Sequence, residues 1–208
     1  MFVEEIMTKN VVTVSPHNSL KEALKLISDN RIRHLPVVSA EGKLVGIVTD
    51  RDLRDAKPSN LEAERINLLS NIQVNKIMKT NPITAHPLDT IDDAARLLYS
   101  NKIGCLPVVT EETIVGIITH GDLLRSLVEL MGVDSPGSLF IIEFQDRPGV
   151  LAEISQIIKS LDVNINSIFL RRVKDKPGLK TLTIRVSAMI PEPIIDEIRK
   201  AGFKILWP

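Results

Sequence analysis

The 208-residue chain contains a single cysteine, Cys105, and very few aromatic residues, which make up 3% of its composition. One cysteine allows no internal disulfide and suits a reducing compartment. The scarcity of aromatic rings leaves little surface on which the bases of single-stranded nucleic acid could stack. The 26 basic residues are balanced by 26 acidic residues, so the chain also lacks the basic excess typical of a general nucleic-acid surface.

Long apolar runs are missing as well. No stretch approaches the roughly 18 residues needed to span a bilayer, and the first residues are acidic rather than apolar as in a signal peptide. We therefore expect a cytoplasmic protein with no membrane or nucleic-acid partner. Hydrophobic residues still make up 44% of the chain, which is enough for the core of one large domain or two small ones.

Catalytic motifs are the third absence. The sequence has no Gly-x-Gly, P-loop, Gly-x-Ser-x-Gly or His-Glu-x-x-His pattern, and its 4 histidines are scattered. Cys105 has no matching histidine, so a buried thiol is favoured over a nucleophile. We expect no catalytic residue, no metal site and no required cofactor, and hence a protein that is not an enzyme.

An eight-residue stretch occurs twice, as Gly46–Leu53 and as Gly116–Leu123, and in each copy a Gly and an apolar strand lead to Thr-x-x-Asp. The similarity extends upstream, because residues 6–38 align with residues 77–109 at an offset of 71, with 13 of 33 positions identical. We interpret this pattern as an internal duplication. Two units of this size can bury each other's helical faces, whereas one alone is marginal.

Thr-x-x-Asp after a strand is a capping box, in which the Thr hydroxyl accepts a helix-end N–H and the Asp carboxylate accepts the N–H of the Thr. A helix N-terminus can also receive a phosphate, and an Asp there suits the two hydroxyls of a ribose. One copy alone is explained by a plain helix cap. The presence of both Thr49–Asp52 and Thr119–Asp122 favours a nucleotide site.

Each repeat is expected to contain an extended segment, a helix, two strands and a second helix. In the first repeat these are Val11–Val14, a helix capped by Asn18 or Ser19, His34–Ser39, Leu44–Val48 and a helix from Asp50. Residues 57–73 have no counterpart in the repeat, and Ala63–Leu69 is predicted to form a connecting helix. The second repeat is expected to end in a helix Asp122–Met131, before a Pro- and Gly-containing linker.

The pattern after the linker predicts a βαββαβ order, a ferredoxin-like unit of about 70 residues. The predicted elements are Leu139–Phe144, Val150–Leu161, Asn164–Val173, Lys180–Ser187, Glu192–Ala201 and Phe203–Leu206. Pro148 lies where the start of a helix tolerates proline.

The repeat resembles a tandem pair of CBS domains, which form one module of the Bateman type that binds adenosyl ligands. The resemblance is carried by Thr13–Pro16 and Thr84–Pro87, by Leu-Pro-Val-Val at Leu35–Val38 and Leu106–Val109, and by the two Gly-x-x-Thr-x-x-Asp motifs. It covers residues 1 to about 130. The C-terminal part resembles an ACT domain through Asp146–Leu151 and Val163–Asn166.

This resemblance implies a mixed fold, α+β and α/β, with two CBS repeats followed by a ferredoxin-like ACT domain. The expected boundaries are 1–56 for the first repeat, 57–73 for the connection, 74–131 for the second repeat, 132–137 for the linker and 138–208 for the ACT domain.

The resemblance also implies binding residues. In CBS pairs the Asp of the repeated motif binds the ribose diol, and the Thr contacts ribose or phosphate; here these are Asp52, Asp122, Thr49 and Thr119. Adenine lies against the first segment and the Leu-Pro strand, which implies Thr13, Val14, Pro36, Thr84, Ala85 and Pro107. Basic residues just before Leu-Pro contact phosphates in an energy-sensing kinase subunit, which implies Arg33 and His34.

The two repeats differ in charge near the implied phosphate. The first has Arg31, Arg33, His34 and Arg51, whereas the second has Lys102 with Gly104, Cys105 and Gly121 at the matching positions, and His120 as a further contact. Arginine binds phosphate bidentately, so the first copy is expected to prefer more phosphate charge. Without a ligand, the same residues would form a solvated basic edge.

The ACT resemblance implies an amino-acid site at the turn of Asp146, Arg147, Pro148 and Gly149, completed by Asn164 and Asn166 from the strand of a neighbouring subunit. The alternative is a helix that starts at a proline and an exposed strand edge that pairs in a homodimer. Both interpretations stay open.

Two functions remain. In the first, AMP, ADP or ATP on the CBS pair changes the geometry that the protein presents to a partner such as a metabolic enzyme. In the second, the clefts stay empty and the chain is an interaction scaffold. Both Thr/Asp pairs favour the first. The domain order also resembles that of bacterial proteins of acetoin utilisation, which implies a role in acetoin or central carbon metabolism. No individual residue of the sequence indicates acetoin.

Overall fold

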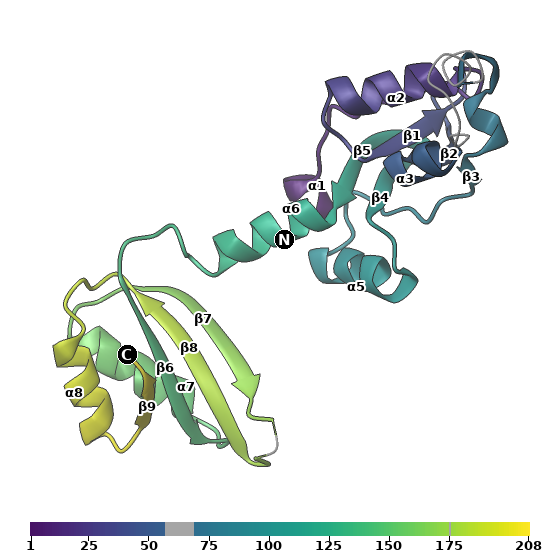
Figure 1. Cartoon of the computed structure of the whole chain (residues 1–208). Helices are drawn as coiled ribbons and strands as arrows, with labels where there is room; N and C mark the ends of the chain where they lie inside the picture. The colour runs from purple at the N-terminus through teal and green to yellow at the C-terminus, as the bar shows by residue number, and fades with distance from the viewer. Residues whose placement is uncertain (57–68, 175) are drawn as a thin grey trace. The chain divides into compact units, whose positions relative to one another are not determined.

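The computed structural model describes residues 1–56, 69–174 and 176–208, which fall into two compact units, residues 1–124 and residues 125–208 (Figure 1). The predicted connecting helix lies outside the described residues, apart from Leu69. Both repeats belong to the first unit. Its elements are α1 (Val3–Ile6), α2 (Leu20–Asp29), β1 (His34–Val38), β2 (Leu44–Thr49), α3 (Asp50–Asp55), η1 (Val74–Lys76), β3 (Lys79–Thr80), α5 (Ile91–Asn101), β4 (Cys105–Thr110) and β5 (Thr113–Thr119), and α6 (His120–Leu130) begins in it.

The long helix of each repeat starts at a side-chain cap. Ser19 Oγ accepts the N–H of Glu22 at 3.2 Å, and the Glu22 carboxylate accepts the N–H of Ser19 at 2.8 Å. In the second repeat, Thr90 Oγ1 accepts the N–H of Asp93 at 3.3 Å. Each helix then buries the apolar residues at helical spacing, Leu20, Ala23 and Ile27 in α2 and Ala94 and Leu98 in α5. The predicted cap and helix of the first repeat are confirmed, with Ser19 rather than Asn18 as the cap.

Each repeat is completed by residues from the start of the other repeat. Strand β3 pairs with β2 of the first repeat, and the N–H and C=O of Thr8 bond to Ile117 in β5 of the second repeat. The cores follow the same exchange. Val74 and Met78 pack in the core of the first repeat, whereas Val3 and Met7 pack in the core of the second. Neither repeat therefore has a complete core of its own.

Two glycines make this exchange possible. A Cβ atom on Gly116 would lie 2.3 Å from the sulfur of Met7, and one on Gly46 would lie 2.8 Å from the sulfur of Met78. The exchanged methionines therefore lie directly on the strands β2 and β5, and any larger residue at these two positions would push them away. The repeated Gly of the eight-residue stretch is explained by this close approach.

The second unit has the predicted βαββαβ order. Its elements are β6 (Ser138–Gln145), α7 (Val150–Ser160), β7 (Ile165–Arg172), β8 (Leu179–Val186), α8 (Glu192–Lys200) and β9 (Lys204–Trp207). The strands form one antiparallel sheet in the order β7-β8-β6-β9, and α7 and α8 cover one face of it (Figure 1). Alternating residues of β6 and β8, such as Phe140, Ile142 and Ile184, pack against these helices. Helix α7 begins at Val150, just after Gly149, so Pro148 precedes the helix rather than starting it.

Candidate functional site

A cleft of about 1080 Å³ opens inside the first unit, lined by residues of both repeats. This volume is slightly above the roughly 300–1,000 Å³ of most small-molecule sites. Ile47, Cys105 and Ile117 form a small buried cluster that lines the cleft. The strand-to-helix junctions β2–α3 and β5–α6 also reach it, so both copies of the repeated motif border the same space.

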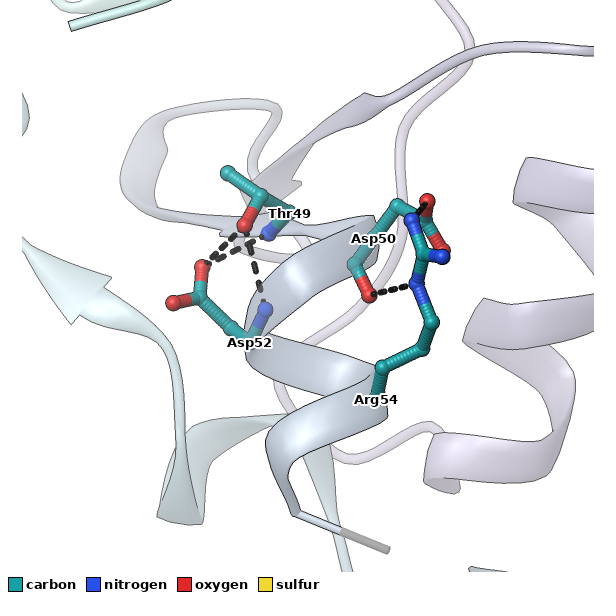
Figure 2. Close-up of polar contacts among 4 residues, drawn as sticks. All are labelled: Thr49, Asp50, Asp52 and Arg54. Carbon is teal, nitrogen blue, oxygen red and sulfur yellow. Dashed lines mark hydrogen bonds and ion pairs between the residues drawn. The ribbon is translucent and has the colours of Figure 1, made fainter.

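Both Thr-x-x-Asp motifs form complete capping boxes. Thr49 donates through its N–H and its hydroxyl to Asp52 Oδ2 at 2.9 and 2.6 Å, and the N–H of Asp52 donates to Thr49 Oγ1 at 3.2 Å (Figure 2). The corresponding distances for Thr119 and Asp122 are 2.9, 2.7 and 3.4 Å. A single carboxylate oxygen of each Asp makes the cap. In Figure 2 the other oxygen of Asp52 points away from Thr49, where it can accept a hydrogen bond from a ligand.

Lys79 is a cleft residue that the sequence alone did not single out. Its Nζ lies 3.8 Å from Asp52 Oδ1, the carboxylate oxygen that the cap does not use. The lysine comes from β3, a strand at the start of the second repeat that pairs with β2 of the first. Its counterpart in the alignment is Thr8, which also lines the cleft but carries no charge.

Positive charge dominates the lining of the cleft. Among the described residues, six cationic side chains line it, against three carboxylates: Arg31, Arg33, Arg51, Arg54, Lys79 and Lys102 against Asp50, Asp52 and Asp122. Arg54 forms an ion pair with Asp50 one turn away on α3. Since the whole chain is neutral, the cleft is a local concentration of positive charge.

This charge is unevenly distributed between the repeats, as the sequence predicts. Arg33 and Arg51 of the first repeat and the matching Gly104 and Gly121 of the second all line the cleft. Arg31 and Lys102 are the one cationic pair that matches. Both follow a helix in the left-handed conformation, with φ of 52° and 53°. Such backbone costs a non-glycine residue on the order of 1 kcal/mol, and it holds both cations at the cleft.

His34 lies between the repeats. A Cβ atom on Gly104 would lie 2.5 Å from His34 Nε2, so the imidazole rests directly on that glycine. Burial lowers the pKa of His34 below its ordinary value of 6.5, and the nearby His120 and Arg33 lower it further, while the Asp52 carboxylate acts in the opposite direction. The imidazole is therefore mainly neutral at pH 7.

The cleft includes nine of the residues that the CBS resemblance implied, namely Arg33, His34, Thr49, Arg51, Asp52, Pro107, Thr119, His120 and Asp122. The other five do not line it: Thr13, Val14, Pro36, Thr84 and Ala85. Val14 and Ala85 are buried, and each forms a bridge to the Leu-Pro-Val strand of its own repeat. Residues earlier in the same segments, such as Val12 and Ile83, line the cleft instead.

The ACT candidates lie at opposite ends of one sheet. Strands β6 and β7 are both antiparallel to β8, so the turn Asp146–Gly149 after β6 is far from Asn164 and Asn166 at the start of β7. At the turn, Arg147 is paired with Glu153 at 2.5 Å and Asp146 with Lys180 at 2.8 Å. One chain does not bring the two sets together, so the predicted site would need a second subunit.

Two further properties concern only the part of the chain that the structure describes. In that part, no three or more His, Cys, Asp and Glu side chains are grouped so that they could hold a metal ion. None of its helices has the length and apolar character that crossing a bilayer requires.

Comparison with known proteins identifies both parts of the chain. The CBS domain model matches residues 3–59 and 74–129, and the ACT domain model matches residues 134–203. A CBS domain-containing protein of Dictyostelium discoideum is 36% identical over 144 residues, which cover 66% of this chain and 99% of the relative. Homoserine O-acetyltransferases of two archaea also match, but the chain covers only 24% of their length.

Solved structures match over the first unit. The CBS domain pair of protein MJ0100, in complex with 5'-methylthioadenosine and S-adenosyl-L-methionine, has a TM-score of 0.53 and 32% identity over 61% of this chain and 95% of that one. CBSX2 in complex with AMP gives 0.52 and 32% over 61% and 96%. A Vibrio cholerae protein assigned to acetoin utilization (AcuB) gives 0.55 and 33% over 64% and 95%.

Proposed function

This chain belongs to the CBS-domain family, with a tandem pair of CBS domains followed by an ACT domain, and we propose that it is a regulatory sensor of an adenine nucleotide. The observation that carries the proposal is the charge of the cleft between the repeats. Six cations and two Thr/Asp boxes border one cavity in a chain of zero net charge. Related CBS pairs hold AMP, S-adenosylmethionine or methylthioadenosine, and of these AMP carries the phosphate that such a cleft favours.

The Thr/Asp boxes and the cations bind different parts of the ligand. The outward carboxylate oxygen of Asp52 accepts the hydroxyls of the ribose, because its other oxygen is already used by Thr49. Lys79 and the arginines of the first repeat then meet the phosphate through charge-assisted hydrogen bonds, each worth about 1.5–3 kcal/mol. Helix α3 has only six residues, so side chains rather than a helix dipole supply this attraction.

Ligand binding regulates because the cleft joins two repeats that complete each other. A nucleotide that contacts both repeats favours one arrangement of the pair, and a partner such as a metabolic enzyme binds that arrangement differently. The coupling free energy between nucleotide binding and partner binding is then about 1–3 kcal/mol. The ACT domain assembles two chains through its sheet edge or reads a second metabolite. The similarity to the acetoin-utilization protein supports a role in acetoin or central carbon metabolism.

The experiment that tests this proposal is a thermal-shift series with AMP, ADP, ATP, S-adenosylmethionine and methylthioadenosine. A ligand at a hundred times its dissociation constant adds about 2.7 kcal/mol of apparent stability. We expect the shift to fall strongly in Asp52→Asn or in Asp122→Asn, whichever box holds the ribose.

Asp93→Asn is the matched control. Asp93 also caps a helix together with Thr90, whose hydroxyl donates to Asp93 Oδ2 and accepts the N–H of Asp93, but this cap starts α5 and does not line the cleft. It should lower stability without changing the ligand shift. No shift with any of the five ligands in a folded protein would contradict the proposal, and would leave Thr49 and Asp52 as helix caps in an interaction scaffold.

A further inference from the structure

Two histidines, one from each repeat, meet at Gly104. His34 starts β1, and its Nε2 lies where it would be 2.5 Å from a Cβ atom on Gly104. His120 starts α6, and its backbone N–H donates to the backbone carbonyl of Gly104 at 3.4 Å. Both side chains line the cleft. We call His34 and His120 the histidine pair.

Positive charge surrounds the histidine pair from several elements. The loop before β1 contributes Arg31 and Arg33, the β2–α3 junction contributes Arg51 and Arg54, β3 contributes Lys79, and the loop before β4 contributes Lys102. The acidic groups are Asp50, Asp52 and Asp122, and the thiol of Cys105 is the remaining titratable group. Asp50 is paired with Arg54, and Asp52 lies 3.8 Å from Lys79, so most of the opposing charge is already engaged.

The empty cleft therefore disfavours a further cation. Burial, His120 and Arg33 all lower the pKa of His34, in that order, and only Asp52 opposes them. A phosphate group carries close to two negative charges near neutral pH and three acceptor oxygens. Placed at the histidine pair, it would remove the repulsion and accept a hydrogen bond from a protonated imidazole, both of whose nitrogens donate.

We propose that a phosphate-bearing adenosyl ligand enters this cleft together with one proton, which His34 takes up from solvent. The inference rests on the proposed function and adds its regulation by pH. Binding of such a ligand tightens as the pH falls, because the bound cleft holds more protons than the empty one. A rise of one pH unit in the pKa of His34 on binding corresponds to a gain of up to about tenfold in affinity at low pH.

Isothermal titration calorimetry with AMP tests the proposal. Titrations at one pH near 6.5, in buffers that differ in ionisation enthalpy, give the number of protons taken up per AMP bound. For each AMP bound, we expect the wild-type protein to gain more protons than His34→Gln, with a difference of at most one proton. The comparison between the two proteins cancels the protons that the AMP phosphate itself gains or loses.

Two controls isolate the phosphate and the position. Adenosine differs from AMP only in lacking the phosphate, so its binding should show no difference between wild type and His34→Gln. His17 is exposed and lies outside the cleft, so His17→Gln should take up as many protons as the wild type. If His34→Gln no longer binds AMP, the titration of the His34 Cε1 proton by NMR in the wild type gives the pKa directly, and it should rise when AMP is added.

The outcomes separate the two proposals. Equal proton uptake in wild type and His34→Gln, or a pKa of His34 that AMP leaves unchanged, would overturn this inference while the sensor function stands. A cleft that binds neither AMP nor adenosine would overturn both. Proton uptake that disappears in His34→Gln, but not in His17→Gln, supports His34 as the group that takes up the proton.

Discussion

The two sides of the cleft come from the two copies of the repeat, and they have the same backbone structure but different charged side chains. The box of Thr49 and Asp52 and the box of Thr119 and Asp122 have the same hydrogen bonds, with lengths that agree within 0.2 Å. The side chains around them differ, with arginine opposite glycine at two matching positions. The groups that cap the helices have been kept in both copies, whereas the charges at Arg33 and Arg51 have no counterpart in the second repeat.

The difference at one matching position is chemical as well as electrostatic. His34 and Cys105 both start the first strand of their repeats. The imidazole is partly exposed to the cleft, whereas burial raises the pKa of the Cys105 thiol to about 12. One repeat therefore offers a titratable group near neutral pH, and the other offers an inert one.

Removing a matching core leucine from each repeat should give the largest effect. Leu35 and Leu106 are both fully buried, and each Leu→Ala change should cost about 2–5 kcal/mol of unfolding free energy. Because each core contains residues from the start of the other repeat, we expect either variant to destabilise both repeats in one transition. Urea unfolding followed by circular dichroism measures this, and two separate transitions in the first unit would show that the repeats are independent.

Exchanging one charge between the repeats should give the next largest effect. We expect Arg51→Gly to weaken AMP binding by about tenfold or more, the loss of one charge-assisted hydrogen bond. Gly121→Arg should strengthen it, and a Cβ atom there would meet only Thr119 Oγ1 at an ordinary 3.5 Å. Calorimetric titration of both variants with AMP and with adenosine measures the change in affinity. If adenosine affinity changes as much as AMP affinity, these positions do not contact the phosphate.

His34, unlike its counterpart Cys105, should make the stability of the protein depend on pH near neutrality. Its pKa is lowered in the folded protein, so the unfolded chain binds more protons as the pH falls below 6.5. Stability of the empty protein is therefore lost from about pH 6.5 downward, until the pH reaches the lowered pKa. In His34→Gln this part of the loss should disappear. Thermal unfolding between pH 5.5 and 8 measures it, with His17→Gln as the variant that should keep the wild-type slope.

The smallest expected effect is that of AMP on the reactivity of the Cys105 thiol. With a pKa of about 12, on the order of one Cys105 thiol in 10,000 is ionised at pH 8, and the side chain is buried. Iodoacetamide should therefore modify the native protein far more slowly than the urea-unfolded chain. Because Cys105 lines the cleft, saturating AMP should slow the reaction further. Equal rates in the native and unfolded protein would show that the cleft opens readily.

Most of the architecture was predictable, because local signals decided it. Ser19 with Glu22 and Thr49 with Asp52 predict helix starts that the structure has, and the apolar alternation after residue 138 predicts the order of the second unit. Nine of the fourteen cleft candidates line the cavity, and all of them except Pro107 lie at strand ends or helix starts that the repeat defines.

The remaining features depend on contacts distant in sequence. Lys79 reaches Asp52 only because β3 crosses to the first repeat, and no local pattern predicts that exchange. Val14 and Ala85 are buried by their bridges to Val37 and Val108, so the segment presents earlier residues to the cleft. The alignment did contain one indication of the exchange. Met7 aligns with Met78, and the two glycines on which these methionines lie, Gly116 and Gly46, also align with each other.

The exchange of segments sets an order for synthesis of the chain. Residues 1–9 leave the ribosome before the rest of the first unit, but Ile117, the partner of Thr8, is made more than a hundred residues later. At typical rates of about 5–20 residues per second, the N-terminal segment waits roughly 5–20 s for its place. The first repeat closes earlier, when Lys79 and Thr80 emerge to pair with β2. The segment around Thr8 thus docks late in the synthesis of the first unit, and the cleft is complete only after Ile117 has been made.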